Sequence, residues 1–123
     1  MKKAIYPGTF DPITFGHIDL IKKSLSIFDK VIVAVSDGNT KNYLFDANER
    51  EHLIKKALFN DLKFSKKKII VTSFKTLTTD FCKKMKSNVI IRGLRATSDF
   101  EYEFQLAGMN KKLNSNIETM FLM

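Results

Sequence analysis

Cysteine, proline and histidine are scarce in this sequence, and long apolar runs are missing. The single cysteine, Cys82, cannot form a disulfide within the chain, and no CxxC or Cys/His cluster with zinc-ligand spacing surrounds it. We therefore expect Cys82 to be a small buried residue of a helix. No run of about 18 apolar residues could cross a membrane, and the first residues lack the apolar segment of a signal peptide. We expect a cytoplasmic protein that is not attached to a membrane.

Repeats, low-complexity segments and linkers are absent as well. The 123 residues, 44% of them hydrophobic and eleven of them Phe, are enough to form one core, which predicts a single domain over residues 1–123. This length is close to the lower limit at which a core suffices alone, so oligomerisation would add stability. The sequence also shows no nucleophile with an adjacent base and no carboxylate pair of a hydrolase. Covalent and hydrolytic mechanisms are therefore disfavoured.

The net charge of the chain is +8, and it allows two interpretations. It could attract an anionic partner such as a nucleotide, a phosphorylated metabolite or a nucleic acid. Alternatively, the excess is solvated lysine, because most of it lies in lysine pairs at expected helix ends and loops. A nucleic-acid-binding module is disfavoured, since the sequence shows neither a helix-turn-helix nor a basic face with interleaved aromatics. The arginines are more informative, because Arg92 and Arg95 share one short motif.

Apolar strand-like runs alternate with helical patterns along the chain. Strands are expected at residues 3–6, 31–35, 69–72, 88–91 and 118–123. The first helix is predicted from apolar residues at helical spacing, which are Ile18, Ile21, Leu25 and Phe28. The order βαβαβαβαβ predicts the α/β class: a Rossmann-like, doubly wound, five-stranded parallel sheet with helices on both faces, in three α/β/α layers.

Candidate capping residues mark the starts of the later helices. Asp46 is a plausible N-cap, with Glu49 three residues on as its capping-box partner. Thr76 or Thr79 is expected to cap the next helix, and Asp99 is expected to cap the last and longest one. Each of these side chains can accept a hydrogen bond from an N–H group that would otherwise be unpaired in the first helical turn.

The stretch from Tyr6 to Leu20 predicts a phosphate site, because a strand leads through small residues into a helix, YPGTFDPITFGHIDL. A helix N-terminus offers unpaired N–H groups and the positive end of the helix dipole. Gly8 would permit an unusual backbone angle, and Thr9 would add a hydroxyl donor. His17, on the first turn, would direct a further donor at the same anion. The alternative is that His17 only caps the helix.

Two arginines follow the fourth expected strand in the segment RGLR, residues 92–95. The forked guanidinium groups of Arg92 and Arg95 can each bind phosphate through two hydrogen bonds. The alternative is ordinary ion pairing with Asp99 or Glu103. Because this segment and the turn after the first strand both lie at carboxyl ends of parallel strands, we expect them to form one site near the switch point of the sheet.

Lys41, in the polar loop after the second strand, could reach the same cleft or remain solvated. The expected site would then combine a helix N-terminus with four side chains, His17, Lys41, Arg92 and Arg95. Such a set suits phosphoryl or nucleotidyl transfer, because positioning and charge neutralisation supply most of the catalysis in those reactions.

Two motifs together carry a family resemblance: GTFDPITFGH, residues 8–17, and RGLRATSDFEYEFQLAGMN, residues 92–110. With them the sequence resembles, over essentially its whole length, the bacterial phosphopantetheine adenylyltransferases of the coenzyme A pathway. That family belongs to the nucleotidyltransferase superfamily marked by an H/T-x-G-H motif. The resemblance implies transfer of an adenylyl group from ATP to 4′-phosphopantetheine, which gives dephospho-coenzyme A and pyrophosphate. It also implies Mg²⁺ as cofactor and a homohexamer built as a dimer of trimers.

The resemblance further implies roles for individual residues. His17 would stabilise the pentacovalent transition state at the α-phosphate, while Lys41 and Arg92 would hold the phosphate of phosphopantetheine. The implied catalytic residues are His17, Lys41 and Arg92. The implied ATP contacts are Thr9, Phe10, His17, Gly93, Leu94, Arg95 and Glu103. The implied phosphopantetheine contacts are Thr9, Lys41, Leu77, Thr78 and Arg92.

Two features depart from the family pattern. Phe15 stands where the family usually has Asn, which would change the hydrogen bonding of the turn but not His17. The sequence ends at Met123, before a segment that wraps ATP in the family, so we expect a domain truncated at its C-terminus with the C-terminal helices missing. Two alternatives stay open. One is another transferase of the superfamily, such as a cytidylyltransferase or a nicotinate-nucleotide adenylyltransferase; the other is a non-catalytic nucleotide- or phosphate-binding protein.

Overall fold

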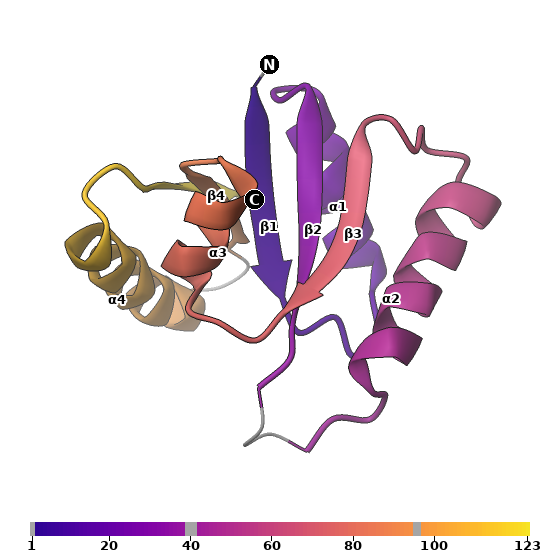
Figure 1. Cartoon of the computed structure of the whole chain (residues 1–123), viewed down its shortest axis with the longest axis horizontal. Helices are drawn as coiled ribbons and strands as arrows, with labels where there is room; N and C mark the ends of the chain where they lie inside the picture. Colours follow the sequence, from indigo (N-terminus) through magenta and orange to yellow (C-terminus); the bar gives the residue numbers. More distant parts are fainter. Residues whose placement is uncertain (1, 39–41, 95–96) are drawn as a thin grey trace.

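The computed structural model describes residues 2–38, 42–94 and 97–123, and in it strands alternate with helices (Figure 1). The strands are β1 (Lys3–Gly8), β2 (Lys30–Ser36), β3 (Ile69–Phe74), β4 (Val89–Gly93) and β5 (Glu118–Leu122). The helical segments are α1 (Phe15–Leu25), α2 (Ala47–Lys55), the π-helical turn η1 (Lys56–Asp61), α3 (Thr78–Met85) and α4 (Thr97–Leu113). The expected strands are all present, with small differences at their ends.

The strands form one parallel sheet in the order β3-β2-β1-β4-β5. From β1 the chain winds outward through β2 to β3, then crosses back to β4 on the other side of β1. This is the predicted doubly wound sheet, and its order reverses between β1 and β4. The sequence of β2 shows why it is an interior strand of the sheet. Val31, Val33 and Val35 are buried on one face of the sheet, and Ile32 and Ala34 are buried on the other.

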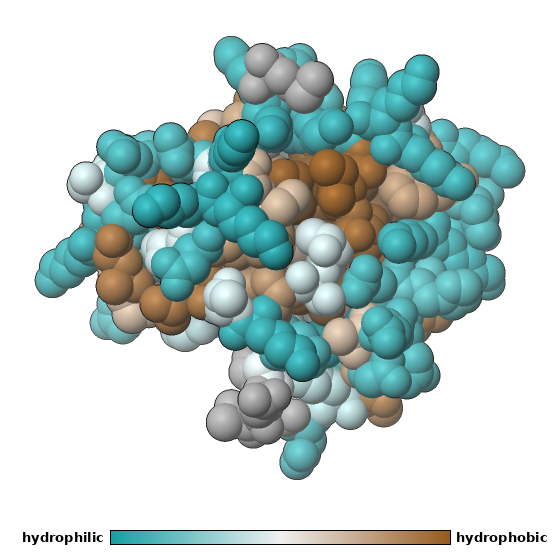
Figure 2. Space-filling view, viewed as in Figure 1, coloured by the Kyte–Doolittle hydropathy of each residue, from teal (hydrophilic) through white to brown (hydrophobic). Residues whose placement is uncertain are grey.

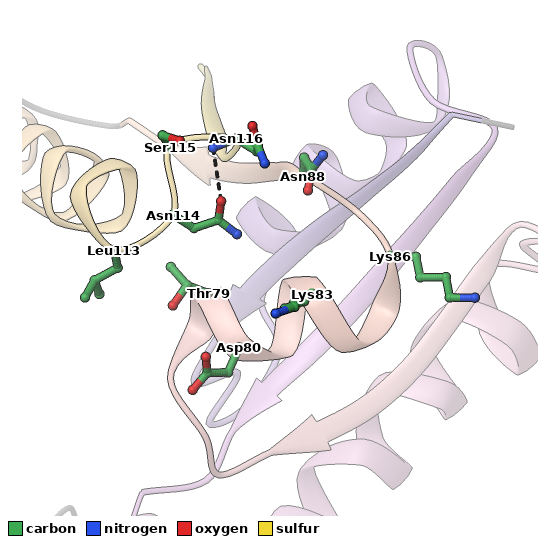
Figure 3. Close-up of a pocket in the computed structure, with 9 residues that line it drawn as sticks. All are labelled: Thr79, Asp80, Lys83, Lys86, Asn88, Leu113, Asn114, Ser115 and Asn116. Atoms are coloured by element: carbon green, nitrogen blue, oxygen red, sulfur yellow. Dashed lines mark hydrogen bonds between the residues drawn. The ribbon is translucent and has the colours of Figure 1, made fainter.

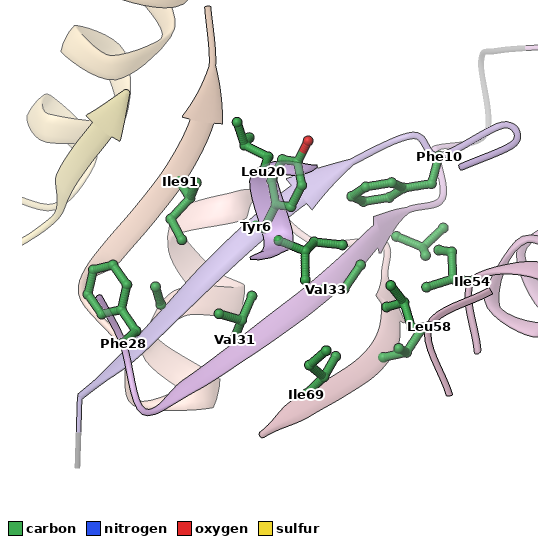
Figure 4. Close-up of a cluster of buried hydrophobic side chains, with 14 residues drawn as sticks. Tyr6, Phe10, Leu20, Phe28, Val31, Val33, Ile54, Leu58, Ile69 and Ile91 are labelled. Carbon is green, nitrogen blue, oxygen red and sulfur yellow. The ribbon is translucent and has the colours of Figure 1, made fainter. Parts of the chain in front are cut away.

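Helices cover both faces of the sheet, which gives the three predicted layers (Figure 1). On one face, Leu20 of α1, Ile54 of α2 and Leu58 of η1 pack with the valines of β2 (Figure 4). On the other face, Phe81 and Cys82 of α3 belong to a second buried cluster. Cys82 is fully buried in a helix, as its sequence context predicts.

The second face of the sheet is the one turned toward the viewer in Figure 1. Figure 2 shows apolar side chains gathered there over the middle of the sheet, with hydrophilic side chains around them. Ile70 of β3 and Met85 of α3 are only partly buried against the cluster on this face. None of the helices in the described part of the chain is both long enough and apolar enough to span a bilayer.

The capping prediction is confirmed for α2 and wrong for α4. The Asp46 carboxylate accepts from the Glu49 N–H at 2.8 Å, and the Glu49 carboxylate accepts from the Asp46 N–H at 3.3 Å. Helix α4 starts at Thr97, so Asp99 lies inside the helix instead of at its N-cap.

Helix α3 begins without any side-chain cap. Its N-cap is Leu77, whose side chain makes no capping hydrogen bond. The Thr76 hydroxyl donates to the carbonyl of Leu77 at 3.3 Å, and Thr79 is buried in the first turn at 5% exposure. Both threonines were therefore wrongly predicted as caps, since Thr79 is used for packing and Thr76 bonds a carbonyl.

Candidate active site

The two motif segments meet at the carboxyl edge of the sheet, where β1 and β4 are paired neighbours. They line one cleft of about 610 Å³. The segment after β1 contributes Tyr6, Pro7, Gly8, Thr9, Phe10, Asp11, Pro12, Thr14, Gly16, His17, Asp19 and Leu20. The rest of the lining is Arg92, Gly93, Leu94, Glu103, Leu122 and Met123. The cleft thus lies at the switch point of the sheet, where a parallel α/β fold binds its ligands.

Phe10 forms the floor of the turn between β1 and α1. Its ring is 1% exposed and meets the rings of Tyr6 and His17 edge-on, at centroid distances of 5.2 and 4.8 Å. The backbone of Phe10 has a φ of 49°, whereas no glycine among the described residues has a positive φ. Gly8 is needed for space, because a Cβ there would lie 3.0 Å from the Phe10 ring. The prediction that Gly8 supplies an unusual backbone angle was therefore wrong.

His17 is both a helix cap and a residue of the cleft. The Thr14 N–H donates to Nδ1 of His17 at 3.0 Å, while the His17 N–H donates to the Thr14 hydroxyl oxygen at 3.4 Å. Because an N–H donor must meet a lone pair, Nδ1 is the acceptor and the neutral ring carries its proton on Nε2. The capping box therefore selects the tautomer in which Nε2 can donate to an anion. Phe15 is 87% exposed and lies outside this hydrogen-bonded pair.

Arg92 is held by Glu103 in a two-pronged ion pair. Nε and Nη2 of Arg92 donate to the two carboxylate oxygens of Glu103 at 2.8 Å each, and Nη1 donates to the carbonyl of Pro7 at 2.9 Å. The hydrogen bond with Glu103 raises the pKa of Arg92, although burial acts in the opposite direction. The guanidinium stays charged and keeps further N–H donors for a ligand. Ion pairing with Glu103, one of the two sequence interpretations, is confirmed for Arg92.

Two residues that tie the site together were not recognised in the sequence. The Asp11 carboxylate accepts from the N–H groups of Leu44 and Phe45, at 2.5 and 2.8 Å, and so joins the β1–α1 turn to the segment before α2. Arg50 of α2 is fully buried and bonds the carbonyl of Thr9 at 2.9 Å. Asp11 stands in the motif GTFDPITFGH and Arg50 stands in no motif, but nothing in the sequence around either residue signals these contacts.

The remaining expected site residues divide into three groups. Thr9, Gly93 and Leu94 line the cleft. Leu77 and Thr78 do not line it, since they lie at the start of α3, which packs on the face of the sheet opposite to α1. Lys41 and Arg95 lie outside the described residues.

A second groove of about 540 Å³ lies between α3 and the turn that leads into β5. Its lining is Thr79, Asp80, Lys83, Lys86, Asn88, Leu113, Asn114, Ser115 and Asn116. These side chains do not converge, and Lys86 points away from the turn at Asn114 to Asn116 (Figure 3). The groove also lies at the amino ends of β4 and β5, whereas ligands of parallel sheets bind at the carboxyl ends. The cleft at the carboxyl edge is therefore the candidate active site.

Sequence comparison places this fold and cleft in a family. The cytidylyltransferase-like family matches residues 5–123. The chain is 76% identical over 124 residues to the phosphopantetheine adenylyltransferase of Pelagibacter ubique, a match that covers all of this chain and 76% of that protein. The chain belongs to the phosphopantetheine adenylyltransferase family. Membership confirms the resemblance carried by the two motifs, and it makes the chain a nucleotidyltransferase.

Two further comparisons agree with this family. The phosphopantetheine adenylyltransferase of Francisella tularensis subsp. novicida is 53% identical over 121 residues, which cover 98% of this chain and 72% of that protein. The crystal structure of the lipopolysaccharide core biosynthesis protein from Thermoplasma volcanium has a TM-score of 0.69 at 22% identity, covering 100% of this chain and 97% of that one. The structural similarity shows the fold alone. The sequence identity is what distinguishes phosphopantetheine adenylyltransferases from other members of the superfamily.

Proposed function

We propose that the cleft at the carboxyl edge transfers the adenylyl group of ATP to 4′-phosphopantetheine. The products are dephospho-coenzyme A and pyrophosphate. The observation that carries the proposal is the arrangement of two cationic or donor groups on opposite sides of one cleft, in a chain of this family. The helix N-terminus with His17 lies on the side of β1, and Arg92 lies on the side of β4.

The reaction needs positioning and charge more than it needs a base. A phosphate oxygen of 4′-phosphopantetheine forms a bond to the α-phosphorus of ATP. The bond from that phosphorus to the bridging oxygen of the β-phosphate breaks, and pyrophosphate leaves with the bonding electrons. Because the nucleophile is already an anion, no side chain has to remove a proton. Nε2–H of His17 stabilises the charge that grows on the α-phosphate, and Arg92 offsets the repulsion between the two anions.

The binding roles inferred from the family are part of the proposal. ATP would contact Thr9, Phe10, His17, Gly93, Leu94, Arg95 and Glu103. The acceptor would contact Thr9, Lys41, Leu77, Thr78 and Arg92. Since Leu77 and Thr78 lie at the start of α3, on the face of the sheet opposite to α1, the pantetheine arm would extend from the cleft around the carboxyl edge toward that face. Glu103 uses both carboxylate oxygens on Arg92, so it would also orient the arginine that binds the acceptor phosphate.

Mg²⁺ and the cellular location stay proposals. Within the described residues, no three His, Cys, Asp or Glu side chains come together as a metal site. This part of the chain therefore offers no such cage for Mg²⁺. Mg²⁺ commonly enters such reactions on the phosphates of the nucleotide. A cytoplasmic location would suit a nucleotidyltransferase that uses ATP.

Pyrophosphate release tests the proposed function. The purified chain should release pyrophosphate when ATP and 4′-phosphopantetheine are supplied together with Mg²⁺, and not with either substrate alone. Replacing 4′-phosphopantetheine with nicotinate mononucleotide, or ATP with CTP, should abolish the signal. Turnover with those replacements would favour another transferase of the superfamily. A chain that binds ATP without any turnover would favour the non-catalytic alternative.

A further inference from the structure

Arg50 is a buried charged residue that the proposed chemistry leaves unused. It lies in α2, and its side chain is 0% exposed. Burying a guanidinium costs free energy unless its N–H donors find acceptors and its charge is compensated. Because no surface of Arg50 is accessible, it cannot touch a substrate in this structure.

The guanidinium of Arg50 bonds three separate segments of the chain. Nη1 donates to the carbonyl of Thr9 at 2.9 Å and to the carbonyl of Ser36 at 2.9 Å. Nε donates to the carbonyl of Phe45 at 3.0 Å, and Nη2 pairs with the Asp37 carboxylate at 3.3 Å. The guanidinium also lies over the ring of Tyr43, with Cζ 4.0 Å from the ring centroid.

These contacts connect the cleft to both ends of the segment between β2 and α2. Thr9 lines the cleft, Ser36 is the last residue of β2, and Phe45 directly precedes the N-cap of α2. Phe45 is held on both main-chain groups, because its carbonyl accepts from Arg50 and its N–H donates to Asp11. Arg50 and Asp11 therefore hold Ser36 and Phe45 against the turn that would receive the α-phosphate.

We propose that Arg50 is a positioning residue for adenylyl transfer. By bonding Thr9, Ser36 and Phe45 at once, it sets the distance between the nucleotide side of the cleft and these two residues, Ser36 and Phe45. The inference rests on the proposed function, in which Lys41, which stands between Ser36 and Phe45 in the sequence, serves the acceptor. Lysine could not replace Arg50, since a single ammonium cannot reach carbonyls on three segments in the way a planar fork can.

The test compares Arg50→Lys and Arg50→Met with a destabilised control, Leu58→Ala. Leu58 is also fully buried on the same helical unit, but it belongs to the apolar cluster. For each variant, kcat and the KM of both substrates are measured well below its melting temperature. The Arg50 variants should lose about 10- to 100-fold in kcat, because small misplacements of reacting groups are that costly. Leu58→Ala should lower the melting temperature with kcat and KM within about twofold of wild type.

Three outcomes overturn the proposal: wild-type kcat in Arg50→Lys, an equal kcat loss in Leu58→Ala, or a loss confined to melting temperature. If the Arg50 variants do not fold, Asp37→Asn decides, since it weakens one contact of Arg50 at a side chain that is 25% exposed. An unchanged kcat in that variant would also refute the proposal. An inactive wild-type chain refutes the proposed function instead. In that case the hydrogen-exchange rates of the N–H groups of Leu44 and Phe45 still test whether Arg50 holds these residues in place. The rates should increase in Arg50→Lys but not in Leu58→Ala.

Discussion

At the scale of single residues, the two ring nitrogens of His17 have different partners in the proposed reaction. Nδ1 completes the capping box with Thr14, and Nε2–H would donate to the α-phosphate of ATP. An alanine at this position would remove both functions, so its effect on activity would be ambiguous. Amide side chains can separate them, because the oxygen of Asn can take the place of Nδ1 and the nitrogen of Gln the place of Nε2.

We expect His17→Asn to lose activity and His17→Gln to lose stability. His17→Asn keeps an acceptor for the Thr14 N–H, so kcat should fall about 10²–10³-fold with little change in melting temperature. His17→Gln keeps a donor near the cleft but loses the cap, which should cost about 1 kcal/mol of stability. Pyrophosphate release and thermal unfolding measure the two effects. Calorimetric titration with phosphopantetheine should show nearly normal affinity in both variants, and a large affinity loss with kcat intact would contradict the assignment of His17.

Glu103 is expected to act by holding the guanidinium of Arg92 in place. In Glu103→Gln, an amide NH₂ replaces one of the two oxygens that accept from Arg92, so a donor faces a donor in a mostly buried pair. We expect the free energy of unfolding to fall by about 1–3 kcal/mol and the KM of phosphopantetheine to rise. Urea unfolding and steady-state kinetics measure these changes. Glu101→Gln, an exposed change on the same helix, should stay within about 0.5 kcal/mol of wild type. Equal effects of the two substitutions would argue against a role for the ion pair.

At the scale of the elements, sequence patterns predicted those strands and helix starts that depend on neighbouring residues alone. The strand of Val31 to Val35 followed from its β-branched run, and the start of α2 followed from Asp46 and Glu49. The cap of α3 was not predictable in this way, since Leu77 makes no side-chain bond and only packing orders that turn. The turn η1 was not expected either, because nothing in its sequence distinguishes a π-helical turn from the end of an α-helix.

The functional site, too, has features that the local sequence predicts and features that only long-range contacts determine. The rule that ligands bind at the carboxyl ends of parallel strands predicts from the sequence that the β1 turn and the β4 segment form one site. Arg50 and Asp11 could not be recognised, because they bond partners 41 and 34 residues away, Thr9 and Phe45. Whether a charged residue is buried depends on contacts with residues that are far away in the sequence. The spacing of residues along a single helix does not determine it.

Helix α3 leads to a prediction about pH. Its packing on the sheet buries Cys82 and raises the pKa of the thiol from 9.0 to about 11. In the native chain the thiolate population should thus be about 100-fold lower than in an unfolded chain at pH 8. We expect iodoacetamide to label native Cys82 at least that much more slowly than in urea, as measured by mass spectrometry.

The raised pKa of Cys82 also predicts how the stability of the fold changes with pH. Between pH 9 and pH 11 the unfolded thiol loses its proton before the folded one, so stability should fall as pH rises through this range. Urea unfolding of wild type and Cys82→Ala isolates the contribution, because the variant should lack this part of the pH dependence. Rapid labelling of the native chain at pH 8 would mean that α3 does not stay docked on the sheet.

At the scale of the whole molecule, helix α4 exposes an apolar surface that one chain alone does not cover. The rings of Phe100 and Phe104 stack at 5.8 Å, and both are about half exposed or more, at 48% and 64%. Tyr102, Met109 and Leu113 on the same helix are also exposed, at 63%, 53% and 55%. Apolar surface of this kind often marks an interface between subunits. Such a surface would suit an assembly of several copies of this chain, and the homohexamer implied by the family resemblance is one such assembly.

Light scattering after size exclusion tests that assembly. The wild-type chain should have a mass several times the 14.2 kDa of the monomer. Phe104→Glu should lower the mass, because a carboxylate buried in an apolar interface would lack a partner. Leu62→Glu introduces the same charge at a half-exposed leucine just after η1, away from α4, and should leave the mass unchanged. A wild-type mass equal to the monomer would refute the hexamer. An equal response of both variants would show that α4 is not the interface, and the exposed rings would then need another partner.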